Sequence, residues 1–133
     1  MTEDAHEALV REAWDAYGRS DVGRLLESVD PDLTWTFLDP SQPDPEPRTC
    51  HGRDELEHAL RRQADQGLTS RIDELTAHGD QVLLVLHTPG LDQHRARRAA
   101  DRNYFVVTVH GGRITALHAC RNQAEARALA GLA

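Results

Sequence analysis

Apolar residues recur at helical spacing in two stretches near the N-terminus. In the first, four positions follow the i, i+3, i+4, i+7 pattern and predict a helix over residues 4–19. Its inner face carries Val10, Ala13, Trp14 and Tyr17. The second stretch repeats the pattern and predicts a short helix that stops at Asp30–Pro31. Its inner face carries Val22, Leu25, Leu26 and Val29.

Strand patterns fill most of the remaining chain. Strands are predicted over residues 33–37, 70–77, 82–88, 103–110 and 113–120. Residues 33–37 alternate cleanly between polar and apolar side chains, as a half-buried strand does, whereas Ile72 and Leu75 do not alternate. Gly111–Gly112 separates the last two strands and predicts a hairpin with a two-residue turn.

Two further helices are predicted from their N-terminal caps. Asp54 is placed to cap a helix that ends near Gly67. The inner face of this helix carries Leu56, Ala59, Leu60 and Gln63. Asn122, with Glu125 three residues later, is placed to cap a last helix that runs to about residue 130. Residues 39–47 contain four prolines and predict a loop.

This order of elements predicts a single α+β domain over residues 1–133, in which helices pack against a curved antiparallel sheet. A chain of 133 residues is long enough for one hydrophobic core. Residues 91–101 join two strands and include Arg95, Arg97 and Arg98. This basic stretch indicates a solvated hairpin tip, and contact with an anionic ligand is the alternative.

Composition excludes several classes of function. The net charge of −7 argues against a nucleic-acid binder and against binding to anionic membranes, because both need a basic face. No apolar run is long enough to span a bilayer, and the acidic start does not resemble a signal peptide, so we expect a cytoplasmic protein. The chain has no CxxC or HExxH motif, and we predict no metal and no cofactor. A disulfide between Cys50 and Cys120 stays open.

The two-residue turn sets a register for the last hairpin. With His110 opposite Arg113, the count along both strands brings Arg102 opposite Arg121. Two like charges in this arrangement destabilise the sheet unless an anion lies between them. The anion is either an acid of the chain, such as Asp39, or a ligand carboxylate or enolate. Alternatively, both arginines extend into water at the ends of their strands.

Three segments resemble the nuclear transport factor 2-like superfamily and, within it, the polyketide-cyclase-like (SnoaL-like) branch. They are residues 14–21 (WDAYGRSD) leading into Leu25–Leu26, residues 51–56 (HGRDEL) and residues 109–114 (VHGGRI). The resemblance extends over residues 8–130 and rests on the order and spacing of these segments. It implies a cone, in which helices line the concave side of a bent sheet, a pocket opens at the wide end, and dimers form through the sheet.

The resemblance carries no catalytic residue over to this chain. In ketosteroid-isomerase-like members, the oxyanion-hole tyrosine falls at Ala13, the catalytic base at Phe37 and the protonated aspartate near Val106. The aspartate of cyclases and epoxide hydrolases falls at about Ala119. None of these side chains accepts a proton or donates a hydrogen bond, so none of the known mechanisms transfers.

The same resemblance implies which hairpin face is concave. The concave face is expected to carry Arg102, Tyr104, Val106, Thr108, Thr115, Leu117, Ala119 and Arg121. The convex face is expected to carry Phe105, Val107, Ile114 and His118. Both faces hold apolar residues, and the chain has few helices to cover them. We therefore expect a homodimer through the convex sheet face.

The predicted pocket combines aromatic walls with a few polar groups, as small-molecule sites do. The predicted ligand-binding residues are Trp14, Tyr17, Trp35, Phe37, Arg102, Tyr104 and Arg121. Asp39 and His51 are the predicted catalytic residues, because either side chain can move a proton. Plainer roles remain for all of them: core packing for the aromatic side chains, a turn before Pro40 for Asp39, and a strand end for His51.

Two functions fit this pocket. The first is an isomerase, cyclase or dehydratase that transfers a proton on an apolar oxygenated metabolite, with Tyr17, Arg102 and Arg121 holding the developing oxyanion. The second is a non-catalytic protein of the same fold that binds a small apolar or acidic organic ligand, or another protein. Two titratable side chains converging inside a closed pocket favour the first function. A pocket filled by Trp14, Trp35 and Phe37 favours the second.

Overall fold

The computed structural model describes residues 2–132. Its helices are α1 (Glu3–Gly18), α2 (Val22–Glu27), α3 (Asp54–Asp65) and α4 (Gln123–Leu129), with a short 3-10 helix, η1, at Leu91–His94. Its strands are β1 (Val29–Phe37), β2 (Arg48–His51), β3 (Arg71–His78), β4 (Gln81–His87), β5 (Arg102–His110) and β6 (Arg113–Cys120). Within the described residues, no helix is both long and apolar enough to cross a membrane.

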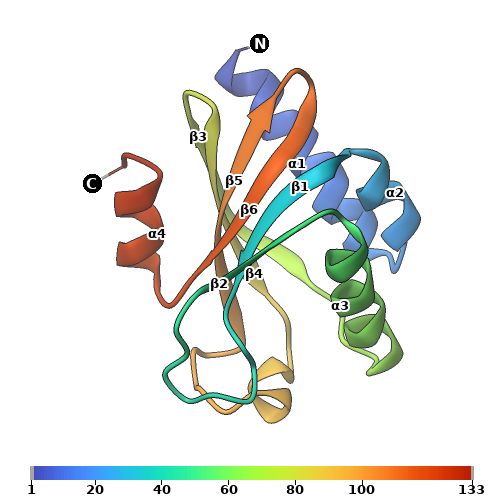
Figure 1. The fold of residues 1–133 in the computed structure, drawn as a ribbon, viewed down its shortest axis with the longest axis vertical. Coiled ribbons are helices and arrows are strands. Elements are labelled where there is room, and N and C mark those ends of the chain that lie inside the picture. The colour runs from blue at the N-terminus through green and yellow to red at the C-terminus, as the bar shows by residue number, and fades with distance from the viewer. Residues whose placement is uncertain (1, 133) are drawn as a thin grey trace.

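The six strands form one curved, open sheet in the order β2-β1-β6-β5-β4-β3. All neighbouring strands are antiparallel except β1 and β6, which are parallel. Helices α1, α2 and α3 lie on one side of the sheet, and α4 lies on the other (Figure 1). The predicted α+β class and curved sheet are confirmed.

Two cores form, one on each face of the sheet. The larger core joins the concave face to α1, α2 and α3, and it fully buries residues such as Val10, Leu25 and Val107. The smaller core lies under α4, where Ala126 packs with Val106 and its neighbours. Each fully buried aliphatic side chain contributes about 1.5–3 kcal/mol to folding, so both faces of the sheet add to stability.

The chain leaves α2 earlier than the helical pattern predicts. Val29, predicted on the inner face of that helix, is instead the first residue of β1. There it pairs with Ile114, whose amide donates to the carbonyl oxygen of Ser28 at 2.8 Å. Pairing with β6 therefore overrides the helical spacing. Pro31, which has no amide hydrogen, lies where the β1–β6 register is interrupted.

Two local expectations also change. Arg53, not Asp54, is the N-cap residue of α3, and it makes no side-chain capping bond. Asp54 is the first helical residue, where its negative charge suits the helix dipole. In β3, the pairing with β4 shifts between Ile72 and Glu74. This bulge explains why Ile72 and Leu75 pack on the same core without regular alternation.

The last hairpin forms at the predicted turn, but its register then slips. The two turn glycines have φ values of 60° and 77°, and His110 pairs with Arg113 as predicted. Thr115 then forms a bulge, so that Thr108 pairs with Ala116. The Oγ1 of Thr115 donates to the carbonyl oxygen of Thr108 at 3.4 Å. Because side chains alternate along a strand, a slip of one residue reverses the face that β5 shares with β6.

The predicted faces are therefore right for β6 beyond the bulge and wrong for β5, and Ile114, which precedes the bulge, lies on the concave side instead of the convex one. Leu117 and Ala119 lie on the helix side as predicted, but their partners on β5 are Val107 and Phe105. Tyr104 and its alternate neighbours face the other way, and Tyr104 packs in the small core under α4. The bulge at Thr115 therefore decides which alternate side chains of β5 lie on the concave side.

The residues predicted for the dimer face are mostly misplaced for the same reason. Phe105, Val107 and Ile114 pack in the larger core, and only His118 lies on the outer face. The outer face also has its own cover, because Ala126 of α4 packs against it. Helix α4 therefore covers part of the apolar surface that was expected to need a second chain. The homodimer itself stays a prediction, which light scattering tests.

Candidate ligand-binding cavity

A cavity of about 470 Å³ opens between the concave face of the sheet and α3. Its apolar walls include Trp35 and Phe37 of β1, Phe105 of β5 and Ala119 of β6. The rings of Trp35 and Phe37 lie 4.8 Å apart at an angle of 37°. The alternation along β1 places both rings on one face, and they line open space rather than fill it.

A smaller cavity of about 70 Å³ extends the first toward α1. The two cavities share Trp35, Ala59, Gln63, Asn103 and Phe105. Trp14 and Tyr17 close the inner end, and each is only 3% exposed. The Tyr17 hydroxyl donates to the Oε1 of Gln63 at 2.8 Å. Burial raises the pKa of Tyr17 to about 12, so this phenol stays protonated at neutral pH.

The loop between β4 and β5, residues 88–101, forms another wall of the cavity. Its contributions are Leu91, His94, Arg95 and Arg97. It lies beside the proline loop at the lower end of Figure 1, where the Ala96 amide donates to the Pro40 carbonyl at 2.7 Å. The expectation of a solvated hairpin tip is wrong, because Leu91 and the Arg95 side chain are almost completely buried.

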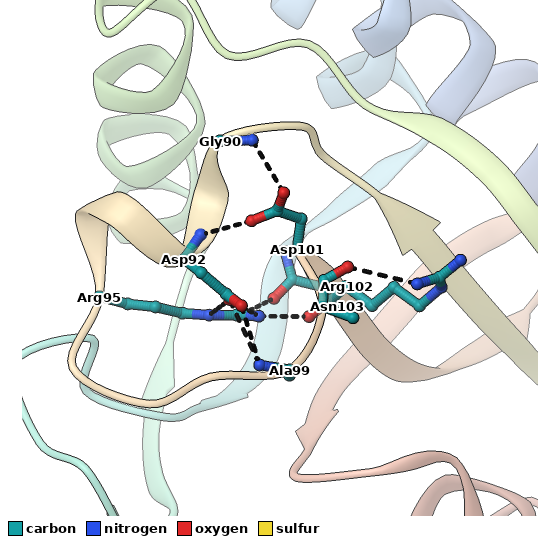
Figure 2. Close-up of polar contacts among 8 residues, drawn as sticks. Gly90, Asp92, Arg95, Ala99, Asp101, Arg102 and Asn103 are labelled. Carbon is teal, nitrogen blue, oxygen red and sulfur yellow. Dashed lines mark hydrogen bonds and ion pairs between the residues drawn. The ribbon is translucent and has the colours of Figure 1, made fainter.

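Asp101 closes the base of this loop. Its two carboxylate oxygens accept from the Asp92 amide at 2.8 Å and the Gly90 amide at 3.1 Å (Figure 2). These two hydrogen bonds lower the pKa of Asp101. Its own carbonyl oxygen accepts from the Thr88 amide at 2.8 Å. The first and last residues of the loop are thereby tied together.

Arg95 forms the centre of a second set of contacts (Figure 2). Its Nε and Nη2 lie 2.9 and 2.7 Å from the Oδ1 of Asp92. The guanidinium also donates to the Arg102 carbonyl at 2.8 Å and to the Oδ1 of Asn103 at 3.1 Å. Burial alone would raise the pKa of Asp92, but the bonds from Arg95 and from the Ala99 amide outweigh it and lower the pKa. Arg95 is therefore structural and already neutralised.

The charged groups around the cavity are mainly cationic, although the whole chain carries −7. The arginines in the lining are Arg62, Arg95 and Arg97, and Glu55 is its carboxylate. Arg62, Glu55 and His94 are exposed at the mouth. The Nε of Arg97 is buried and has no hydrogen-bond partner among residues 2–132. Desolvation, together with the charge of Arg95, lowers the pKa of Arg97.

The two predicted catalytic residues lie outside the cavity lining. Asp39 is in the proline loop, and its Oδ1 accepts from the amide and the hydroxyl of Ser41 at 2.9 and 2.7 Å. These bonds lower the pKa of Asp39 and stabilise a turn. His51 is exposed at the end of β2, and it pairs with Thr34 on the face opposite Trp35. Neither side chain is placed to reach a ligand between the aromatic walls.

The predicted Arg102–Arg121 pair does not form. The Nε of Arg102 lies 2.9 Å from the Oδ2 of Asp73 on the outer side of the sheet. The Nε of Arg121 lies 3.3 Å from the Oδ1 of Asp44, and its Nη2 donates to the Pro45 carbonyl at 2.7 Å. The idea that the two arginines share one anion is therefore wrong. The bulge in β6 separates them, and each has its own acidic partner.

The two cysteines are free and lie on opposite faces of the sheet, so the open question of a disulfide is answered. Cys50 lines the cavity, and Cys120 belongs to the small core under α4. Burial raises the pKa of both thiols, that of Cys120 to about 11. Within residues 2–132, no three His, Cys, Asp or Glu side chains lie together in a way that suits a metal ion.

Several lining residues were not identified from the sequence. They are Cys50, Glu55, Arg62, Gln66, Leu91, His94 and Asn103, whereas Arg95 and Arg97 were named with contact to an anionic ligand as the alternative. Most come from the 88–101 loop and from one side of α3. The feature of the sequence that pointed to this wall of the cavity was the group of arginines in residues 95–98 of an otherwise acidic chain. Its interpretation as a solvated tip missed the buried pairing of Arg95 with Asp92.

A curved sheet around N-terminal helices, with a cavity on the concave side, defines the nuclear transport factor 2-like, or cystatin-like, class of proteins. The family model of the SnoaL-like domain matches residues 10–117. The chain therefore belongs to the SnoaL-like family, as the three sequence segments indicated. No match is found among curated proteins.

Solved structures agree with this fold. An NTF2-like protein of unknown function from Burkholderia pseudomallei K96243 is 23% identical, with a TM-score of 0.66, over 98% of each chain. A candidate polyketide cyclase from Xanthomonas campestris pv. campestris is 19% identical, with a TM-score of 0.65, over 90% of this chain and 92% of that one. A candidate ketosteroid isomerase from Kribbella flavida DSM 17836 is 13% identical, with a TM-score of 0.62, over 88% and 77%. At these identities, the likeness shows the fold alone.

Proposed function

We propose that this protein binds a small organic compound with a mainly apolar ring system between the sheet and α3. The observation that carries the proposal is the unfilled space beside the paired rings of Trp35 and Phe37. Its volume of about 470 Å³ lies within the range of small-molecule sites. Aromatic surfaces without packing partners forgo dispersion contacts, which a ring-shaped ligand restores.

Polar groups deep in the cavity fit oxygen atoms on such a ligand. Asn103 and Gln63 line both parts of the cavity. Arg95 donates to the Oδ1 of Asn103, and Tyr17 donates to the Oε1 of Gln63. Each amide oxygen is therefore occupied by a donor, which leaves the NH₂ groups to donate elsewhere. A carbonyl or hydroxyl oxygen of the ligand is a suitable acceptor.

Proton transfer, as in an isomerase, cyclase or dehydratase, is the second candidate function. It is favoured by Glu55 and His94, because both are titratable and border the cavity. Asp39 and His51 do not border the cavity. Named polyketide cyclases and a named ketosteroid isomerase have the same fold. However, Glu55 and His94 are both exposed at the mouth, and the lining of the inner extension has no carboxylate or imidazole. Binding is therefore the function that the geometry supports best.

Calorimetric titration with naphthalene-sized probes, such as 2-naphthol, tests binding. Ala59→Phe places a ring in both parts of the cavity and is expected to abolish binding. Ala124→Phe, on the exposed surface of α4, is the matched control and is expected to bind as the wild type does. Binding that survives Ala59→Phe while the variant stays folded contradicts the proposed site.

A separate measurement tests proton transfer. In deuterated buffer, an enzyme of this type is expected to speed deuterium exchange at the acidic carbon of 2-tetralone, followed by proton NMR. Glu55→Gln is expected to remove the acceleration if Glu55 is the base, because an amide does not accept a proton at neutral pH. Exchange at the rate of the buffer alone, with the ketone bound, leaves the non-catalytic function.

A further inference from the structure

Arg97, which is half-buried, differs from the buried Arg95 of the same loop because its charge has no acidic partner within residues 2–132. Arg95 pairs with Asp92, and Arg121, directly after β6, pairs with Asp44. Arg97 forms no ion pair within residues 2–132, and its Nε is buried without a hydrogen-bond partner. Its side chain lines the cavity. An unpaired cation thus borders the space between the aromatic walls.

Leaving a guanidinium in this state is costly. The side chain as a whole is half-buried, but its Nε–H donor is buried without an acceptor, and this carries a desolvation penalty. Burial lowers the pKa of Arg97, and the neighbouring charges of Arg95 and Arg121 lower it further, against a smaller opposing effect of Asp92. The local potential is therefore positive, and it favours an anion.

We propose that Arg97 binds an anionic oxygen of the ligand, so that the cavity takes ring compounds carrying a carboxylate, phenolate or enolate. This inference rests on the proposed function and narrows its class of ligand. The apolar ring lies against Trp35 and Phe37, and the anionic oxygen meets the guanidinium on the wall formed by the 88–101 loop. A planar guanidinium suits a carboxylate because two parallel N–H donors match its two oxygens.

The backbone on both sides of Arg97 is held in place. The Ala96 amide donates to the Pro40 carbonyl at 2.7 Å, and the Ala99 amide donates to the Asp92 carboxylate at 3.1 Å. The Asp101 contacts close the same loop at its base. A backbone that is already ordered loses little entropy when a ligand binds, so the segment that carries Arg97 is preorganised.

The other cations of the lining fit this role less well. The donors of Arg95 are occupied by Asp92, Arg102 and Asn103. Arg62 is exposed at the mouth, where water screens its charge. Arg97 alone combines a buried donor, a place in the lining and the absence of an ion-pair partner within the described residues.

The test compares two probes of nearly the same shape, 2-naphthoate and 2-naphthamide, by calorimetric titration at low salt and neutral pH. The wild type is expected to bind the carboxylate about tenfold more tightly or better, since hydrogen bonds to charged groups are the stronger ones. Arg97→Gln is expected to remove this preference and leave the affinity for the amide unchanged. Arg98→Gln, a change at the exposed neighbour, is expected to keep the preference.

Arg97→Lys is the second variant, because it keeps the charge if Arg97→Gln fails to fold. It is expected to retain part of the preference, since a lysine pairs with a carboxylate through a single ammonium. Equal affinity of the wild type for both probes overturns the role of Arg97 and leaves the proposed function intact. Retained preference in Arg97→Gln also overturns it. Failure of both probes to bind contradicts the proposed function, and the anion site with it.

Discussion

Among the interactions of the 88–101 loop, we expect the contact between Arg95 and Asp92 to contribute most to the stability of the fold. Only 3% of the Arg95 side chain and 14% of the Asp92 side chain are exposed. Arg95→Met keeps much of the aliphatic stem and removes the guanidinium. It leaves a buried carboxylate with fewer partners, and it leaves Asn103 and the Arg102 carbonyl without their donor.

The size of the effect follows from this geometry. Removing one partner of a buried ion pair costs about 3–5 kcal/mol. Asp92 retains the Ala99 amide and some contact with water, so the lower end of the range, about 3 kcal/mol, is expected. The entropy of unfolding is about 2.1 cal/mol/K per residue, so for 133 residues a loss of this size lowers the melting temperature by about 10 °C.

Thermal unfolding followed by circular dichroism measures the difference, with urea unfolding as an independent estimate of the free energy. Arg98→Met is the matched control: it changes an exposed arginine three residues later and is expected to stay within about 0.5 kcal/mol of the wild type. A loss below about 1 kcal/mol in Arg95→Met, which is the size of a surface pair, would refute the buried role of this contact.

Three further predictions concern single groups. The pKa of Asp92 is lowered in the folded state, so its stabilising contribution is present above pH 3.8 and is lost as the pH falls below that value; acid unfolding should show a weaker dependence in Arg95→Met. One of the two tyrosines should ionise near pH 12 in an absorbance titration, and Tyr17→Phe should remove that transition. Asp39→Ala should leave ligand affinity unchanged in calorimetry, and a large loss would place Asp39 at the site after all.

Regular elements were predictable because the pattern of side chains carries their period. The helix at Glu3–Gly18 and the hairpin turn at Gly111–Gly112 depend on contacts between near neighbours in the chain, which a pattern records directly. The boundary at Val29 was missed because it depends on Ile114, which is distant in sequence. The local spacing of apolar residues favoured a helix that continues through Val29. The parallel pairing of β1 with β6 ends the helix earlier.

The register of the last hairpin shows how a local irregularity spreads. The turn glycines set the first pair correctly, but nothing in the sequence around Thr115 marks the bulge as a Gly or Pro would. All faces of β5 beyond that point were therefore reversed. Arg102 and Tyr104 moved to the outer side, and Phe105 and Asn103 took their places at the cavity. The aromatic pair on β1 was predictable because no irregularity lies between its two members.

The sheet determines the fold, whereas the loops and α3 supply most of the polar groups of the cavity. The fold can therefore be identified without knowing the ligand. The sheet and its helices supply an apolar cone that proteins with little sequence identity share, so it carries no information about the chemistry. The groups with chemical character come mainly from α3 and from the 88–101 loop, which the chain builds with its own acids and arginines. Asp92 neutralises Arg95 and Asp101 closes the base of the loop, so Arg97 is the arginine of this loop that lines the cavity without an ion-pair partner within residues 2–132. An acidic protein thereby presents a cationic cavity wall, and selection among apolar ring compounds is expected to depend on that wall more than on the aromatic rings.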